Sequence, residues 1–314
     1  MFNSTTAGPP PGAGLPGGPS LTARRRPAET VIKALLITSA LVSVAITFGI
    51  IAAMVGPVVE FFRQVPVGDF FSWTDQGDKN LRPAVLPLVL GTFMVTVIAL
   101  VLAVPLGLGA AMYLSEYATR RTRKWLKPTV ELLAGVPSVV YGFFAVFWLT
   151  PTVLNGWLGL EVSFTNSLAA GILLGVMIIP TIASLSEDAL SAVPQSLRQG
   201  SLAMGANRRQ TTLRVVLPAA TSGVAAAVVL GMSRAVGETM IVALAGGSAK
   251  NLSLDMGEGH QTMTAFIAQA AQGENPVGTP SYNMLFAVAM LLFLITLTIN
   301  AVSIYFVRRF RQVY

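Results

Sequence analysis

The stretch VVLPAATSGVAAAVVLGMSRAVGETMIVALAGG, residues 215–247, decides the fold class of this chain. It is longer than the roughly 20 apolar residues that a helix needs to cross the hydrocarbon core of a bilayer. Two ionisable residues, Arg234 and Glu238, interrupt its second half. The stretch therefore predicts a membrane-spanning helix, and a charge at membrane depth is costly enough to indicate a function.

The composition of the whole chain agrees with a membrane protein. Of 314 residues, 53% are hydrophobic and 11% are charged, whereas about a quarter of the residues in an average soluble domain are charged. With no cysteine and a single histidine, His260, the sequence excludes a disulfide framework and a thiolate metal site, and we expect neither metal nor cofactor. The net charge of +7 does not indicate a nucleic-acid partner, because the basic residues lie between apolar runs.

Six apolar runs are long enough to span a membrane as helices. They cover about residues 31–62, 84–114, 129–151, 167–186, 215–247 and 284–307. With the N-terminus inside, most lysines and arginines outside the runs fall on the inner side, as the positive-inside rule requires. We therefore expect an all-α, multi-pass membrane protein with six transmembrane helices in lipid and both termini in the cytoplasm. Gly171 and Gly175, in the fourth run, are spaced for close helix packing.

The N-terminal residues differ in composition from the rest. Residues 1–27 are rich in proline and glycine and cannot bury a core, which predicts a disordered cytoplasmic tail. Residues 28–314 form the predicted transmembrane domain. At the inner end of its fourth helix, Glu187 and Asp188 are expected to be solvated or to face a partner.

The connection between the fourth and fifth helices, about residues 187–214, is too apolar for a plain loop. Pro194 suits the start of a helix, Gly205 is placed to end it, and Asn207 can cap a second helix. Three residues fall on one face at helical spacing, namely Leu197, Ser201 and Met204. This helix is either a handle that a soluble partner pushes or an amphipathic helix on the membrane surface, and physical reasoning alone leaves both open.

Three stretches resemble a known transporter family. Gly205 and the residues VVLP at 215–218 resemble the end of the coupling motif of bacterial ABC importer permeases. Where that motif usually begins with Glu-Ala-Ala, this chain has Gln199, Gly200 and Ser201. The stretches ELLAGVPSVVYGFF at 131–144 and SRAVGETM at 233–240 resemble the membrane subunits of the phosphate-specific transport system, and GETMIV is similar to its C-type subunit. The resemblance covers about residues 30–312.

The resemblance implies a type I ABC importer permease of the bacterial inner membrane that moves inorganic phosphate inward. Its implied partners are a second permease subunit, a dimer of cytoplasmic ATP-binding subunits, and an external phosphate-binding protein that docks on the outer loops 62–82 and 246–283. The chain has no G-x-x-x-x-G-K-[ST] loop, so we expect ATP hydrolysis on a partner and no enzyme activity here. The predicted contact with the ATPase consists of Pro194, Leu197, Gln199, Gly200, Ser201, Met204, Gly205 and Ala206.

Arg234 and Glu238 are the first candidates for the substrate path. Their i,i+4 spacing on a helix would let them neutralise each other, which explains how the pair is tolerated but not why it is present. Alternatively, Arg234 offers an ionised fork that matches phosphate oxygens, and Glu238 holds the fork until substrate arrives. In AGVPSVVYG, residues 134–142, glycine and proline either break a helix around an anion or allow close packing. Ser138 and Tyr141 are the path-lining candidates in this stretch.

Three alternatives to a phosphate permease remain. The first is the same class of permease for another oxyanion, such as sulfate or molybdate, because an arginine fork does not separate these anions. The second is a secondary anion transporter with Glu238 as a proton carrier. The third is a membrane sensor or scaffold without transport. Labelled-phosphate flux through a reconstituted complex, compared with sulfate flux, would separate them.

Overall fold

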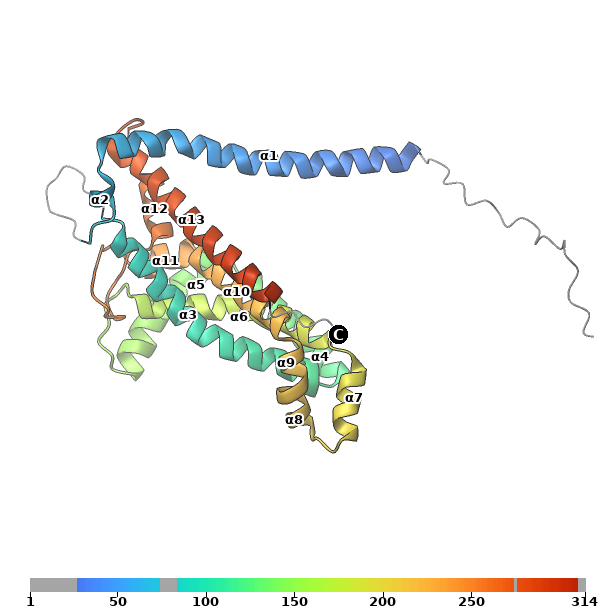
Figure 1. Ribbon diagram of the computed structural model, residues 1–314. Coiled ribbons are helices and arrows are strands. Elements are labelled where there is room, and N and C mark those ends of the chain that lie inside the picture. The colour runs from blue at the N-terminus through green and yellow to red at the C-terminus, as the bar shows by residue number, and fades with distance from the viewer. Residues whose placement is uncertain (1–26, 74–83, 274–275, 310–314) are drawn as a thin grey trace, which may run out of the picture. The chain divides into compact units, whose positions relative to one another are not determined.

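A computed structural model of the protein describes residues 27–73, 84–273 and 276–309. Every helix or strand element assigned within these ranges is a helix (Figure 1). The chain divides into two compact units, one up to Ala52 and one from Ala53 onward. α1 (Pro27–Gln64) begins in the first unit and ends in the second. The prediction of a disordered tail concerns residues that lie outside the described ranges, apart from Pro27, where α1 begins.

The centre of the second unit is the contact between α3 (Leu86–Met112) and α6 (Ser167–Ser191). Two glycines on α6 let the helices approach closely. A Cβ atom added at Gly171 would lie 2.6 Å from the Cβ of Ile98, and one added at Gly175 would lie 2.9 Å from the carbonyl oxygen of Ala99. The prediction that these glycines serve helix packing is confirmed.

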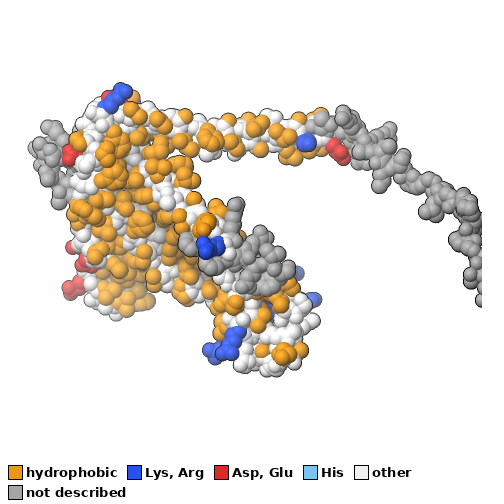
Figure 2. Space-filling model, in the orientation of Figure 1, with side chains coloured by type: hydrophobic (Ala, Val, Ile, Leu, Met, Phe, Trp, Pro, Cys, Tyr) orange, Lys and Arg blue, Asp and Glu red, His pale blue; other side chains and the backbone are white. Residues whose placement is uncertain are grey.

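Five helices in the described part of the chain are long and apolar enough to cross a membrane, namely Val31–Gln64, Leu86–Tyr117, Ser138–Trp157, Ser167–Ser191 and Pro280–Tyr305. A further pair, Arg208–Ala219 and Thr221–Val236, meets the test only together and is bent by 71°. The number of spans is therefore five, or six if the bent pair counts as one, in agreement with the prediction. Figure 2 shows apolar side chains over much of the visible face of the protein, as contact with lipid requires.

The third span begins later than the sequence predicted. α4 (Arg120–Ala134) ends at Gly135, and α5 (Ser138–Phe144) begins after Pro137, whose φ of -57° and ψ of 132° are not helical. The predicted start near residue 129 is wrong because this glycine and proline separate the two helices. The helix break that one alternative requires is therefore present, and anion binding at the break stays a prediction. α5 continues as the π-helix η2 (Ala145–Trp157).

The fifth span is broken, whereas the sequence predicted a continuous run over residues 215–247. α8 (Arg208–Thr211), the π-helix η3 (Thr212–Val216) and α9 (Leu217–Ala219) precede the bend at Ala220, and α10 (Thr221–Val236) follows it. Pro218 supplies no amide hydrogen beside the bend. α10 ends at Val236, and the short α11 (Met240–Ala245) begins after three intervening residues.

The remaining helices pack at the end of the second unit away from α7. There, Phe61 near the end of α1 and Phe70 of α2 (Val67–Phe70) lie in one apolar cluster with Met263 of α12 (Met263–Gln272) and Met284 of α13 (Pro280–Arg309). α13 packs against both α12 and α10 (Figure 1). The predicted outer loop 246–283 thus contains a helix. It also contains His260, which is fully buried and accepts a hydrogen bond from the Ser167 hydroxyl at 2.9 Å, with its Nε2–H donating to the Ser253 carbonyl at 2.7 Å.

Candidate functional site

The break between α10 and α11 determines which groups the Glu238 carboxylate binds. Glu238 lies within the break, and its carboxylate accepts the amide N–H groups of Met240 at 2.9 Å and Ile241 at 3.3 Å. The side chain therefore caps the first turn of α11. The expectation that Arg234 and Glu238 are neighbours on one helix is wrong, because α10 ends at Val236.

Arg234 occupies the last turn of α10 and is exposed on the surface of the chain. No ion pair joins it to Glu238, and none with another described residue is present. The tether by Glu238 that the sequence suggested is thus absent, since the carboxylate binds backbone amides instead. A guanidinium with no acid partner among the described residues is available to an anion from outside the chain.

Tyr141 is the other candidate that the structure places near Arg234. Its ring is buried in α5, and it lies close enough to the guanidinium for the charge of Arg234 to act on it. The Tyr141 hydroxyl donates a hydrogen bond to the Leu133 carbonyl at 3.0 Å, which connects α5 to α4 across the break. Ser138 lies one turn earlier and is half-buried, and no contact of its hydroxyl with Arg234 is present in the described structure.

Gly142 is the position in the AGVPSVVYG stretch that allows close helix packing. A Cβ atom at this position would lie 2.8 Å from the Cδ1 of Leu244, so the glycine allows α5 to pack closely against α11. The stretch therefore contains both a helix break at Gly135–Pro137 and a position for close packing at Gly142.

Threonine side chains line the space beside Glu238, and sequence reasoning missed them. Thr92 and Thr96 of α3 face Thr262 and Thr264 at the start of α12, around a gap narrower than a water molecule. The Thr264 hydroxyl donates to the Glu238 carbonyl at 2.7 Å, and the Met263 N–H donates to the Thr92 hydroxyl at 3.0 Å. The signal in the sequence was the i,i+4 pair of threonines within an otherwise apolar run.

The coupling segment folds as a helical hairpin. Pro194 precedes α7 (Gln195–Ala203), Gly205 ends it with a φ of +86°, and Asn207 forms a capping box with Gln210 at the start of α8. The predictions for Gly205 and Asn207 are confirmed. Met204 follows the helix and is 88% exposed, so it does not share the inward face of Leu197 and Ser201. Of the other predicted contact residues, Gln199 and Gly200 are exposed and Ala206 is half-buried.

Glu187 corrects a second expectation from the sequence. Its side chain is completely buried in α6, where it accepts hydrogen bonds from Arg123 and, at 2.7 Å, from Lys127. Asp188 is more than half exposed and pairs with Lys127 at 2.7 Å. The expectation that both acids are solvated or face a partner fails for Glu187, because α4 places two cations directly against it.

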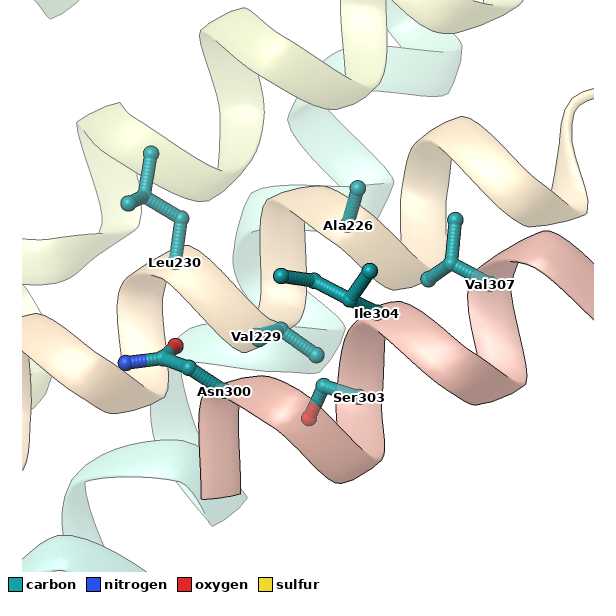
Figure 3. A pocket seen from close by; sticks show the side chains of 7 residues that line it. All are labelled: Ala226, Val229, Leu230, Asn300, Ser303, Ile304 and Val307. Carbon is teal, nitrogen blue, oxygen red and sulfur yellow. The ribbon is translucent and has the colours of Figure 1, made fainter. Parts of the chain in front are cut away.

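A groove of about 270 Å³ lies between α10 and α13 (Figure 3). Its lining is mostly apolar and includes Val229, Leu230 and Ile304. Asn300 at one end accepts a hydrogen bond from the hydroxyl of Ser233 at 2.6 Å. The residue before Arg234 is therefore held to α13, which fixes the rotation of the last turn of α10.

The family described as the binding-protein-dependent transport system inner membrane component matches residues 103–312. The chain belongs to this family. The match includes α4 to α11, and thus both Arg234 and the coupling segment. The predicted membership is confirmed.

Curated relatives within this family are transport permeases. The probable ABC transporter permease protein YqgH of Bacillus subtilis (strain 168) is 40% identical over 217 residues, which cover 68% of this chain and 69% of the relative. The phosphate transport system permease protein PstC of Mycobacterium leprae (strain TN) is 35% identical over 245 residues, 72% of this chain and 76% of the relative.

Solved structures of ABC transporters share the fold. A bacterial alginate ABC transporter, in complex with an alginate pentasaccharide-bound periplasmic protein, matches with a TM-score of 0.64 at 15% identity, over 90% of this chain and 98% of that chain. The MetNI methionine ABC transporter matches with a TM-score of 0.53 at 22% identity, over 73% of this chain and 94% of that chain. At these identities the likeness concerns the fold alone, and it confirms the predicted importer-permease architecture.

Proposed function

We propose that this chain is the transmembrane permease subunit of an ATP-driven importer of inorganic phosphate. The observation that carries the proposal is the Arg234 guanidinium, a permanent charge within the fifth span that is exposed and lacks an acid partner among the described residues. Its planar fork matches the oxygens of a phosphate and can bind two of them at once. The PstC relatives, named as phosphate transport permeases, support this cargo.

The proposed transporter contains three further kinds of subunit. These are a second permease, a pair of cytoplasmic ATP-binding subunits and an external phosphate-binding protein. The exposed face of Arg234 would meet the second permease or a water-filled path between the two permeases. The tip of the α7–α8 hairpin, where Leu202 and Met204 are exposed, would contact the ATP-binding subunits. ATP-driven movement of this tip would then change which side of the membrane reaches Arg234.

The cargo is tested by reconstituting the complete complex in liposomes and measuring uptake of labelled phosphate and of labelled sulfate. We expect ATP-dependent phosphate uptake and little sulfate uptake. Sulfate or molybdate uptake at the same rate would favour the alternative of a general oxyanion permease. Uptake that continues when ATP hydrolysis is blocked would favour a secondary transporter, and no flux of any anion would favour a sensor or scaffold.

The proposed orientation places α4 and α7 in the cytoplasm and the start of α13 outside. The chain has no native cysteine, so single cysteines can be introduced without background. A cysteine at Ser281 should react with an impermeant thiol reagent added to intact cells, and a cysteine at Thr122 should not. Equal labelling of the two positions would contradict the proposed orientation.

A further inference from the structure

The guanidinium of Arg198 on α7 is one of the most buried cations in the described part of the chain. Its side chain is 11% exposed, and the side chain of its partner Glu116 is 8% exposed. Both the Nε and Nη2 atoms of Arg198 donate to the same carboxylate oxygen of Glu116, at 3.1 and 2.9 Å. Removing two charges from water is costly, and the cost is offset only where hydrogen bonds use the remaining donors.

The remaining donors of Arg198 bind backbone carbonyls at the end of α6. Nη2 donates to the carbonyl of Leu190 at 2.7 Å, and Nη1 donates to the carbonyl of Val193. Glu116 belongs to the π-helix η1 (Tyr113–Tyr117), which continues α3. One side chain on α7 therefore contacts the ends of both helices that form the centre of the protein.

The rest of α7 packs loosely compared with this contact. Leu197 packs against an apolar cluster that contains Leu190, Val193 and Val216, and the Ser201 hydroxyl lies 3.0 Å from the hydroxyl of Thr211. No residue of α7 itself is fully buried. Apolar packing of this kind tolerates sliding, whereas a fork with four directed hydrogen bonds fixes both distance and orientation.

We propose that Arg198 is the positioning residue through which a displacement of α7 moves the ends of α3 and α6 together. The inference rests on the proposed function, in which an ATP-binding subunit displaces α7. In this proposal the guanidinium of Arg198 transmits the movement of α7 to the ends of α3 and α6. A residue outside the coupling motif therefore determines how ATP hydrolysis is coupled to transport.

Contacts continue from the end of α6 towards Arg234. Glu187, one turn before Leu190, binds Arg123 and Lys127 of α4. The end of α4 is joined to α5 by the hydrogen bond from Tyr141 to the Leu133 carbonyl. A continuous series of contacts does not itself demonstrate coupling between two sites, so the proposal depends on a measurement of coupling.

The test compares Arg198→Lys with Arg121→Lys in the complete reconstituted complex. Lysine keeps the charge at position 198 but cannot bind Glu116 and both carbonyls at once, whereas Arg121 is exposed and has no ion pair among the described residues. We expect Arg198→Lys to lower phosphate uptake per ATP hydrolysed by about tenfold, with ATP hydrolysis itself changed less than about twofold. The control variant should retain the wild-type ratio.

A second readout does not depend on the cargo. A cysteine at Ser138 reports on the start of α5, one turn before Tyr141. Its rate of reaction with a thiol reagent should change on addition of ATP in the wild-type background. In the Arg198→Lys background we expect this ATP-dependent change to disappear. Because this readout requires no phosphate, it separates the role of Arg198 from the identity of the cargo. If the wild-type complex responds to ATP but does not transport phosphate, the proposed cargo is wrong, whereas the proposed role of Arg198 is not contradicted.

Two results would overturn the role of Arg198. One is an unchanged ratio of uptake to ATP hydrolysis in Arg198→Lys. The other is a partial loss of assembled complex that accounts for the whole loss of uptake, while the Arg198→Lys complex that does assemble responds to ATP like the wild type, which would make Arg198 a merely structural residue. If Arg198→Lys fails to assemble, Glu116→Gln provides the same test, since its amide oxygen still accepts one hydrogen bond from Arg198. Wild-type coupling in an assembled Glu116→Gln complex would likewise contradict the proposal.

Discussion

The charged cluster at the ends of α3 and α6 differs from Arg234 in one respect, the presence of partners. In the cluster, which comprises Glu116, Arg123, Lys127, Glu187 and Arg198, every side chain takes part in an ion pair. Arg234 lies in an apolar part of the sequence and has none in the described structure. Charges that are paired within the chain hold helices together, whereas an unpaired charge retains its binding capacity for another molecule.

The comparison predicts opposite phenotypes for substitutions in the two regions. Removal of the buried Glu187 carboxylate should first lower the stability of the protein, because two cations of α4 lose their shared acceptor. A change at Arg234 should first lower transport, because no ion pair with a described residue is lost.

The largest effect is expected from Arg234→Gln. Glutamine keeps hydrogen-bonding capacity but removes the charge, and the loss of a charged bidentate contact should lower phosphate uptake by about a hundredfold. Arg234→Lys keeps the charge without the fork and should restore transport only in part. Uptake is measured beside the abundance of the chain in the membrane, which should remain at the wild-type level. A fall in abundance that matches the fall in uptake would show that Arg234 stabilises the protein, as the charges of the cluster do, and does not act in transport.

The next largest effect is expected from Glu187→Ala. Removing the buried carboxylate takes from Arg123 and Lys127 their shared acceptor, at a cost of up to about 3 kcal/mol. Arg123 would then retain the Ser191 hydroxyl and Lys127 the exposed Asp188 as acceptors on α6. We expect a lower melting temperature in detergent and less protein in the membrane. Asp188→Asn is the matched control, because this exposed partner of Lys127 should contribute less than about 1 kcal/mol. If Glu187→Ala and Asp188→Asn lower the melting temperature equally, then burial does not determine how much each ion pair contributes to stability.

A smaller effect is expected at Glu238, where the structure assigns the carboxylate to the start of α11. Glu238→Ala removes the cap and should cost about 1 kcal/mol. Glu238→Gln retains an oxygen that can accept the same amides and should keep most of the stability. Melting temperature and uptake measured for both variants test this assignment. If glutamine impairs transport as severely as alanine at normal stability, then the negative charge of Glu238 serves transport directly.

The smallest effect concerns the pH dependence of the cluster. Hydrogen bonds to Asp188 and Glu187 raise the pKa of Lys127 above its ordinary value of 10.5. The stabilisation by its ammonium group is therefore complete below the ordinary pKa and is lost as pH rises through the raised one. The difference in melting temperature between wild type and Lys127→Met should be constant up to pH 10.5 and shrink above it. The exposed neighbour Lys124 provides the control, and Lys124→Met should change melting temperature little at any pH.

Features that depend on nearby residues were predictable from the sequence. Apolar length predicted the spans, and the turn at Gly205 and the cap at Asn207 followed from what each residue does to its own backbone. The candidate site was predicted in part. Arg234 was identified because a charge within an apolar run is conspicuous, but its relation to Glu238 was wrong, since a helical spacing was assumed across Gly237.

Features that depend on residues far apart in the chain were not predictable in this way. Arg198 is 82 positions from Glu116, and Lys127 is 60 positions from Glu187. From the sequence these side chains count only as charges near the ends of helices. Whether such a charge is solvated or buried depends on which helix packs beside it, and the spacing of residues does not contain that information.

The order of the cluster along the chain has a consequence for biosynthesis. Glu116 is its first member and Arg198 its last, so the ribosome has made all five side chains before it reaches Arg234. Chains fold from the N-terminal end as they are synthesised. We therefore expect α3, α4, α6 and α7 to join while α10 and α13 are still absent. A nascent chain with a defective cluster would then be open to proteolysis before its transport site exists.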